Sequence, residues 1–167
     1  MKYLRAIEPE DLDLMYIVEN DTQITRYSST TVPLSRYALK RYIEDSRGDL
    51  FLDQQLRLTI VNPELEVSCG FIDLTDFSPV HCRAQVGIVL LPEAQGWGIA
   101  TMALHELALY ALEQGLKQLY AVVSEENIRG CKLFLRAGYE KISILPRWLQ
   151  SEGRFVDAIL FIKQLTD

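Results

Sequence analysis

The stretch Val86-Gly87-Ile88-Val89-Leu90-Leu91 is followed, after a short turn, by Gln95-Gly96-Trp97-Gly98-Ile99-Ala100-Thr101, and a long helical pattern comes next. The apolar run predicts a buried strand. Glycines before a helix allow main-chain N–H groups to turn towards one point, and a helix N-terminus favours phosphate oxygens. These residues therefore predict a strand, a glycine turn and a helix that together bind a phosphate or pyrophosphate.

Two better-known phosphate loops fit this stretch poorly. A P-loop needs Gly-x-x-x-x-Gly-Lys-Ser/Thr, which the chain lacks. A dinucleotide-binding fingerprint of the Rossmann type needs a small residue at Thr101 and an acidic residue at the end of the following strand, where Glu125 is a weak candidate. Taken alone, the loop also leaves open that its glycines only make a tight turn.

The residues around the loop resemble those of the GNAT acetyltransferase superfamily. Gln95-x-x-Gly98-x-Ala100 after a strand is similar to the acetyl-CoA loop of that family, Gln/Arg-x-x-Gly-x-Gly/Ala. Asn127 and then Leu133-Phe134-Leu135-Arg136-Ala137-Gly138-Tyr139 resemble the Asn and the helix end that follow in the family. The likeness extends from Leu4-Arg5 to Gly153-Arg154-Phe155-Val156-Asp157-Ala158. It is greatest to the branch of spermidine N-acetyltransferases and ribosomal-protein N-terminal acetyltransferases.

The resemblance implies an α+β (α/β) fold in a single acetyltransferase domain over residues 1–167. The sheet would be mixed and mostly antiparallel, with about seven strands, splayed at the cofactor site and covered by helices on both faces. The pattern of the residues gives the same order. It predicts strands at 2–7, 56–61, 67–74, 84–91, 119–123, 139–144 and 155–162, and helices starting near 8–11 and covering 35–46, 100–113 and 128–137.

Composition excludes several function classes. A chain of 167 residues with 49% hydrophobic content suits one domain with a full core. The formal net charge of -6 argues against a nucleic-acid partner. Cys69, Cys82 and Cys131 show no paired spacing, so we expect neither disulfides nor a metal site. Without a signal peptide or a membrane-length apolar stretch, we expect a cytoplasmic protein with no membrane partner.

The resemblance also implies a set of contacts with the co-substrate acetyl-CoA. Main-chain groups of Ile88, Val89 and Leu90 would bond the pantetheine arm, and one N–H would face the thioester oxygen. The amides from Gln95 to Thr101 would hold the pyrophosphate. Asn127 either bonds the arm or caps the helix that starts at Ile128. The expected cofactor-binding residues are Ile88, Val89, Leu90, Gln95, Gly96, Trp97, Gly98, Ile99, Ala100, Thr101, Asn127 and Phe134.

The catalytic residues stay unassigned, because Phe134 stands where relatives often carry a proton-donating Tyr. Cys131, Tyr139 and Gln85 are weak candidates, with Tyr120 close by. Cys131 is expected near the positive end of a helix, where a thiol pKa tends to fall, although a free Cys is more often a core residue. Water could also suffice, because the leaving thiolate of CoA has a pKa of about 8.5 if it resembles a Cys thiol.

We therefore expect an N-acetyltransferase that moves an acetyl group from acetyl-CoA to a primary amine of a small molecule or a protein N-terminus. Alternatives are a noncatalytic CoA-binding module, a nucleotide-binding protein of the Rossmann type and, as a specific substrate, the polyamines spermidine and spermine. Ser29-Thr30-Thr31 replaces the acidic pair of spermidine enzymes, which counts against a polyamine. A thinner acidic set remains, which we interpret as solvated helix ends: Glu19, Asp21, Glu44 and Asp45.

The final hairpin leaves the oligomeric state open. Arg147 and Trp148 precede its expected tip at Glu152-Gly153. These two side chains could border the acceptor site, or they could pack on a second subunit in a homodimer.

Overall fold

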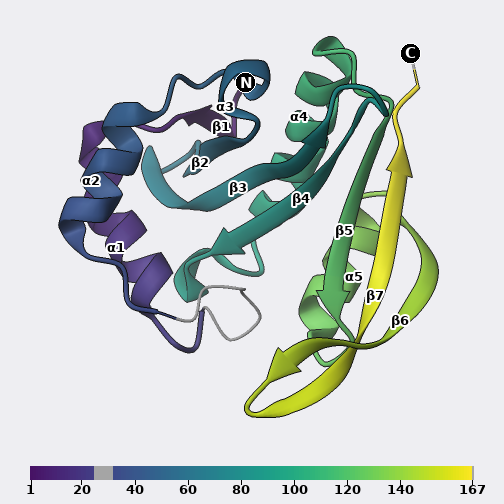
Figure 1. Ribbon diagram of the computed structural model, residues 1–167. Coiled ribbons are helices and arrows are strands. Elements are labelled where there is room, and N and C mark those ends of the chain that lie inside the picture. Colours follow the sequence, from purple (N-terminus) through teal and green to yellow (C-terminus); the bar gives the residue numbers. More distant parts are fainter. Residues whose placement is uncertain (25–31, 167) are drawn as a thin grey trace.

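The computed structural model describes residues 1–24 and 32–166, and its sheet has the strand order β1-β2-β3-β4-β5-β7-β6 (Figure 1). Neighbouring strands are antiparallel except β4 and β5, which run parallel. The predicted mixed, mostly antiparallel sheet is thus confirmed. The strands are β1 (Leu4–Ala6), β2 (Leu56–Asn62), β3 (Val67–Ser78), β4 (Arg83–Leu90), β5 (Gln118–Ser124), β6 (Glu140–Ser151) and β7 (Arg154–Gln164).

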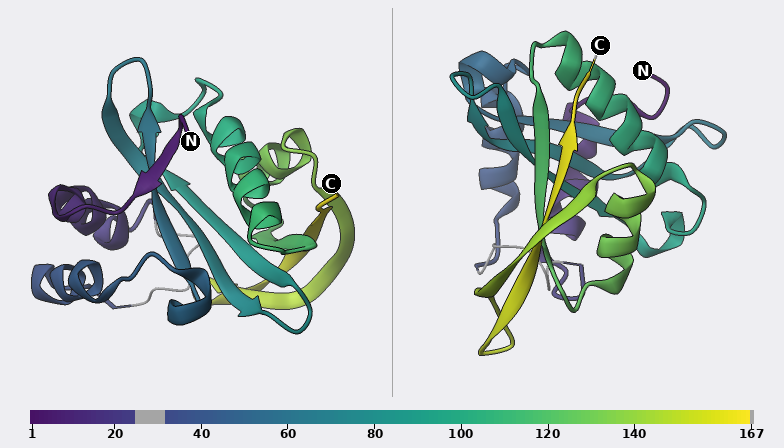
Figure 2. Two further views of the ribbon diagram at one scale, coloured as in Figure 1. Left: turned by 90° about the horizontal axis from the view of Figure 1, so that it is seen from above. Right: turned by 90° about the vertical axis from the view of Figure 1, so that its right-hand side faces the viewer.

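Helices cover both faces of this sheet, as predicted. Figure 2 shows α1 and α2 on one side and α4 and α5 on the other. Helix α3 was not expected; it is a single turn that Asp49 caps by accepting hydrogen bonds from Phe51 N and Leu52 N. Within the described residues, no helix is long and apolar enough to cross a membrane. The helices are α1 (Leu12–Asn20), α2 (Arg36–Asp45), α3 (Leu50–Asp53), α4 (Ile99–Glu113) and α5 (Ile128–Arg136), with 3-10 turns η1 (Pro9–Asp11) and η3 (Pro92–Ala94).

The strand ends differ from the predicted ranges where hairpins are long. The strands expected at 67–74 and 139–144 continue to Ser78 and Ser151. The final hairpin turns at Glu152 and Gly153, both with positive φ, so its predicted tip is confirmed. The segment Ser29-Thr30-Thr31 lies outside the described residues.

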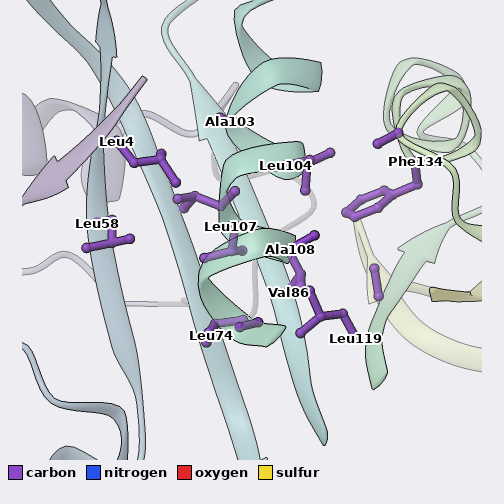
Figure 3. Close-up of a cluster of buried hydrophobic side chains, with 14 of the residues drawn as sticks. Leu4, Leu58, Leu74, Val86, Ala103, Leu104, Leu107, Ala108, Leu119 and Phe134 are labelled. Carbon is purple, nitrogen blue, oxygen red and sulfur yellow. The ribbon is translucent and has the colours of Figure 1, made fainter. Parts of the chain in front are cut away.

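Two apolar clusters of unequal size hold the layers together. The larger one lies between the sheet and α4, where Leu58, Leu74 and Val86 face Leu104 and Leu107 (Figure 3). The smaller cluster lies on the opposite face, which we call the α1/α2 face. Its fully buried members are Met15, Val18, Leu39 and Phe71. Because side chains alternate along a strand, Val86 and Leu90 of β4 belong to the larger core, and Gln85, Gly87 and Val89 point to the α1/α2 face.

Strands β4 and β5 separate after a short paired segment. They pair only between Arg83–Gln85 and Gln118–Tyr120. Beyond these residues β4 continues beside β3, whereas β5 pairs with β7 along its whole length. Figure 1 shows the two strands diverging towards their C-terminal ends. Within the described part of the chain, no strand lies beside the edge of β4 that faces β5 from Val86 onwards, and the predicted splay is present.

A buried carboxylate ties the start of α1 to three strands. Asp11 is 2% exposed and receives both guanidinium N–H groups of Arg5, each at 2.7 Å. The hydroxyls of Thr59 and Ser68 also donate to it, at 2.8 and 3.2 Å. Burial alone would raise the pKa of Asp11, but these hydrogen bonds from Arg5 and its neighbours hold the pKa below the ordinary value.

We predict that Asp11→Asn lowers the free energy of unfolding by about 2 to 3 kcal/mol at neutral pH, since it leaves the Arg5 guanidinium without its counter-charge. Because the pKa of Asp11 is lower in the folded state, its contribution is complete above the unfolded pKa of about 3.9 and is lost as the pH falls through the folded value. Urea unfolding of both proteins at pH 7 and at pH 3 measures this. An equal difference at the two pH values would contradict the prediction.

Candidate active site

The main chain of β4 offers hydrogen-bonding groups at the gap. Leu91 N donates to Cys69 O at 2.9 Å, and main-chain groups of an antiparallel pair alternate in direction. The groups of Ile88 and Leu90 therefore point away from β3, into the gap. Those of Val89 point to Phe71 of β3, so the main-chain bond expected from Val89 does not fit this geometry.

A glycine turn follows β4, as predicted. Gly96 and Gly98 have φ values of 88° and 79°, in the left-handed region that favours glycine. Gly98 is the N-cap of α4 and provides no capping side chain. The first hydrogen bond into the helix is Met102 N to Gly98 O, so the amides of Ile99, Ala100 and Thr101 have no acceptor within the helix. Trp97, between the glycines, is 77% exposed.

Gln95 joins this turn to the neighbouring helix α5. Its Nε2 donates to Leu90 O at 3.2 Å, and its Oε1 accepts from Arg129 Nη1 at 3.1 Å. Arg129 lies in the first turn of α5 and is exposed. The turn contains no cation of its own, and Arg129 supplies one. Arg129 was not among the residues predicted from the sequence. Its position in the first turn of the helix that follows α4 is the signal that could have identified it.

Asn127 is the cap of α5, which is one of its two predicted roles. Its Oδ1 accepts from Gly130 N at 2.9 Å. The cap uses only the amide oxygen, and the NH₂ group of the same side chain is a donor that a ligand could use.

Phe134 and Tyr139 lie in the core. Their side chains are 4% and 2% exposed and meet edge to face, with ring centroids 5.1 Å apart. Figure 3 shows Phe134 directed from α5 towards α4, and the ring also stacks on Phe161. Burial raises the pKa of Tyr139 well above its ordinary value, and its hydroxyl has no hydrogen-bond partner in residues 1–24 and 32–166. The expected cofactor contact of Phe134 and the proposed proton donation by Tyr139 therefore do not fit the packing.

Cys131 and Gln85 lie near the two ends of the gap. The Cys131 sulfur donates to Ser124 O, where β5 ends. Burial raises the pKa of this thiol, so the lowered pKa predicted from its place in α5 is wrong. Gln85 is in the last residue pair of the closed end, opposite Tyr120. The Tyr120 hydroxyl donates to Asp76, and burial together with this bond raises its pKa to about 12.

A hollow of about 320 Å³ opens on the α1/α2 face. At its base the Arg57 guanidinium donates to Asp73 Oδ1 and Oδ2, at 2.6 and 2.9 Å, and to Glu19 Oε1 at 2.5 Å. Glu19 is thus a half-buried partner of Arg57, not the solvated helix end that the sequence suggested. Although burial would lower the pKa of Arg57, the two carboxylates raise it above its ordinary value. The lining residues are Met15, Glu19, Leu34, Ala38, Leu39, Tyr42, Gln55, Leu56, Arg57, Asp73 and Thr75.

A second hollow of about 260 Å³ adjoins the first and shares Tyr42, Gln55 and Arg57 with it. Its remaining lining includes Asp45 and Asp53. We call the two together the carboxylate hollow. Among residues 1–24 and 32–166, four carboxylates and one guanidinium line it, a formal net charge of -3. Asp45 also forms a surface ion pair with Arg41 at 3.5 Å. Without Asp45, the formal net charge of the hollow is -2. No group of three or more metal-ligating side chains occurs in residues 1–24 and 32–166.

The chain is similar to known acetyltransferases. A family profile described as "Acetyltransferase (GNAT) domain" matches residues 3–140. The chain is 28% identical over 161 residues to the spermidine N(1)-acetyltransferase of Escherichia coli, with 93% of this chain and 82% of the relative aligned.

Two crystal structures share the fold over nearly the whole chain. The spermidine N-acetyltransferase of Vibrio cholerae, in complex with CoA and spermine, superposes with a TM-score of 0.86 at 22% identity, covering 97% of this chain and 94% of that one. The ribosomal-protein-S5-alanine acetyltransferase of Vibrio fischeri gives 0.84 at 18% identity, covering 100% and 95%.

Proposed function

The chain belongs to the GNAT acetyltransferase family, and we propose that the amine to which it transfers the acetyl group of acetyl-CoA is a linear polyamine such as spermidine. The net negative carboxylate hollow carries this proposal. A polyamine has several spaced ammonium groups, and a site for it needs carboxylates spread along its length. Glu19 and Asp73 at one end, with Asp45 and Asp53 at the other, meet that requirement.

The names of the relatives support the same acceptor class. The aligned Escherichia coli protein is a spermidine N(1)-acetyltransferase, and the Vibrio cholerae structure holds spermine. Residues 29–31 lack the acidic pair of the spermidine enzymes, which argues against a polyamine. The hollow instead takes carboxylates from other elements, Glu19 from α1 and Asp73 from β3. An acidic site of different composition can thus serve the same cation.

The co-substrate would bind along the opened edge of β4. We assign the pantetheine amides to the main chain of Ile88 and the pyrophosphate to the free amides of Ile99, Ala100 and Thr101. Arg129 would pair with phosphate oxygens from the side of α5, and Asn127 would donate its NH₂ group to the arm. All three cysteines are free thiols, which fits the reducing cytosol where we place the enzyme.

The reaction needs little from the protein beyond alignment. The amine nitrogen attacks the acetyl carbonyl carbon, the C–S bond breaks, and CoA departs as a thiolate. Phe134 has no proton to give, and we assign protonation of the thiolate to water, since a thiol pKa of about 8.5 makes it a fair leaving group. The buried Tyr139 plays no part in this step.

Gly98→Ala should weaken acetyl-CoA binding, because an added methyl group would project into the open space where the pyrophosphate sits. The control is Gly115→Ala at the opposite end of α4, where φ is 85° and the surroundings are equally open. Both variants should lose about 1 to 2 kcal/mol of stability from a non-glycine residue in the left-handed region. Calorimetric titration with acetyl-CoA should show about a tenfold higher Kd for Gly98→Ala only. Equal affinities would mean that the loop is only a turn.

Arg129→Ala should raise the Kd for acetyl-CoA about tenfold, as expected for the loss of a charge-assisted bond. It should also flatten the dependence of that Kd on salt, since one cation fewer meets the phosphates. The control is Arg136→Ala, which removes an exposed arginine from the last turn of the same helix. Titrations at low and high salt compare the two variants, and a similar effect of both would exclude a specific role for Arg129.

The acceptor is tested by thiol release from acetyl-CoA in the presence of spermidine, spermine, putrescine, an amino sugar, a free amino acid and an alanine-terminated peptide. We expect the highest kcat/KM for spermidine or spermine, and a lower value for the amines with one positive charge. Preference for the peptide would overturn the polyamine proposal and leave the family assignment unaffected.

A further inference from the structure

Gly87 leaves the α1/α2 face of β4 bare at one position. The neighbours on that face are Gln85 and Val89, and Val89 packs against the smaller apolar cluster. Gly87 lies two residues beyond Gln85, the last residue of β4 that pairs with β5. The bare position is therefore beside the start of the gap between these strands.

The backbone does not require a glycine at this position. Gly87 is not among the residues with positive φ, and the register with β3 is continuous from Gly70 to Thr75, so no bulge occurs at Gly87. Glycine weakens a strand relative to residues with a side chain. A glycine inside a strand often marks a bulge or the close approach of a ligand, and the continuous register leaves the second.

The bare position lies against Asp73. The two residues are directly paired, and a Cβ built on Gly87 would lie 3.8 Å from both Cβ and Oδ2 of Asp73. These are ordinary contact distances, and no other described atom outside the adjoining residues lies within 4 Å. A side chain would fit here sterically, but it would cover the Asp73 carboxylate on the side of β4.

Asp73 is held in place from the opposite side. Arg57 on β2 donates two N–H groups to it and a third to Glu19, which fixes the plane of the Asp73 carboxylate. An ionised carboxylate offers about four acceptor positions, and the paired guanidinium uses two. The side chain of Asp73 is 19% exposed. It is thus rigid, charged and reachable, with acceptor positions to spare.

We propose that the terminal amino group of the acceptor passes over Gly87 and is held there by a hydrogen bond to Asp73. Gly87 is then a specificity-determining position and Asp73 a positioning residue. Both belong to the acceptor site of the proposed function, on which this inference rests. The amine would meet the thioester beside Ile88, the residue after Gly87, whose main-chain groups point into the gap. The proton that the amine loses on forming the C–N bond goes to solvent, and the electron pair of the C–S bond leaves with the CoA thiolate.

This placement explains how the two substrates approach one another. The co-substrate arm lies along the edge of β4, whereas the carboxylate hollow lies over β2 and β3. A side chain at position 87 would stand between them. Its absence leaves a direct path from Asp73 to the opened edge.

The test is Gly87→Val, with Gly87→Ala as the smaller step. Valine favours strands, and its Cβ would meet Asp73 only at ordinary contact distances, so we expect thermal stability and the Kd for acetyl-CoA to stay at the wild-type values. The KM for spermidine should rise about tenfold or more for valine and less for alanine, because a change of one methylene group in a pocket alters specificity by about this factor. The control is Gln118→Val, which places a valine in β5 at the closed end of the gap without changing the charge. It should leave the KM for spermidine unchanged.

Asp73→Asn gives a second measurement, since it keeps the size of the side chain and removes its charge. Its KM for spermidine should rise with little change in the KM for acetyl-CoA. If Gly87→Val keeps the wild-type KM for spermidine, the inference is overturned. Equal rises in the KM values for spermidine and for acetyl-CoA would also overturn it, because they would place Gly87 in the cofactor site.

The inference and the proposed acceptor can fail separately. Wild-type turnover across the amine panel tests the acceptor class alone. The Gly87 variants are then compared on whichever amine the wild-type enzyme acetylates best. If that amine is a peptide, the polyamine proposal fails, and the ratio of KM values still decides whether the acceptor passes over Gly87.

Discussion

Among the residues that the structure describes, β4 has a strand on only one side beyond Gln85, and its main-chain groups that point away from β3 need other partners. Unpaired N–H and C=O groups in a buried setting are costly. The protein meets part of this need itself, since Gln95 donates to Leu90 O. The remaining groups at Ile88 suit a ligand that carries amides, and pantetheine is such a ligand. The glycine turn, the free start of α4 and Arg129 all lie at the open end of the same edge, where they can hold the rest of the coenzyme.

The sequence predicted the parts of this arrangement that depend on local patterns. The apolar run before Gln95, the alanine- and leucine-rich helix after Gly98 and the cap at Asn127 each depend on residues close together in the chain, and each is present. The glycine turn likewise followed from its position between a strand and a helix.

Residues brought together by distant pairing could not be predicted in the same way. The carboxylate hollow joins Glu19 of α1, Arg57 of β2 and Asp73 of β3, and only the strand register aligns them. For this reason the sequence pattern indicates a solvated Glu19, although the structure pairs Glu19 with Arg57. Arg129 is 34 residues from Gln95 in sequence. The burial of Phe134 and Tyr139 likewise depends on how α5 and the residues after it pack, which a helical pattern alone does not specify.

The unequal division of the apolar core has an evolutionary consequence. The larger core packs α4 against the sheet, whereas α1 and α2 pack through a smaller cluster in which the described residues include four buried and nine partly buried apolar side chains, and through a few ionic contacts. Mutations in this thinner layer disturb little of the hydrophobic packing that stabilises the domain. A lineage can therefore exchange its acceptor while keeping its donor chemistry intact. Two crystal structures that share this fold with TM-scores above 0.8 are named for a polyamine and for a ribosomal protein.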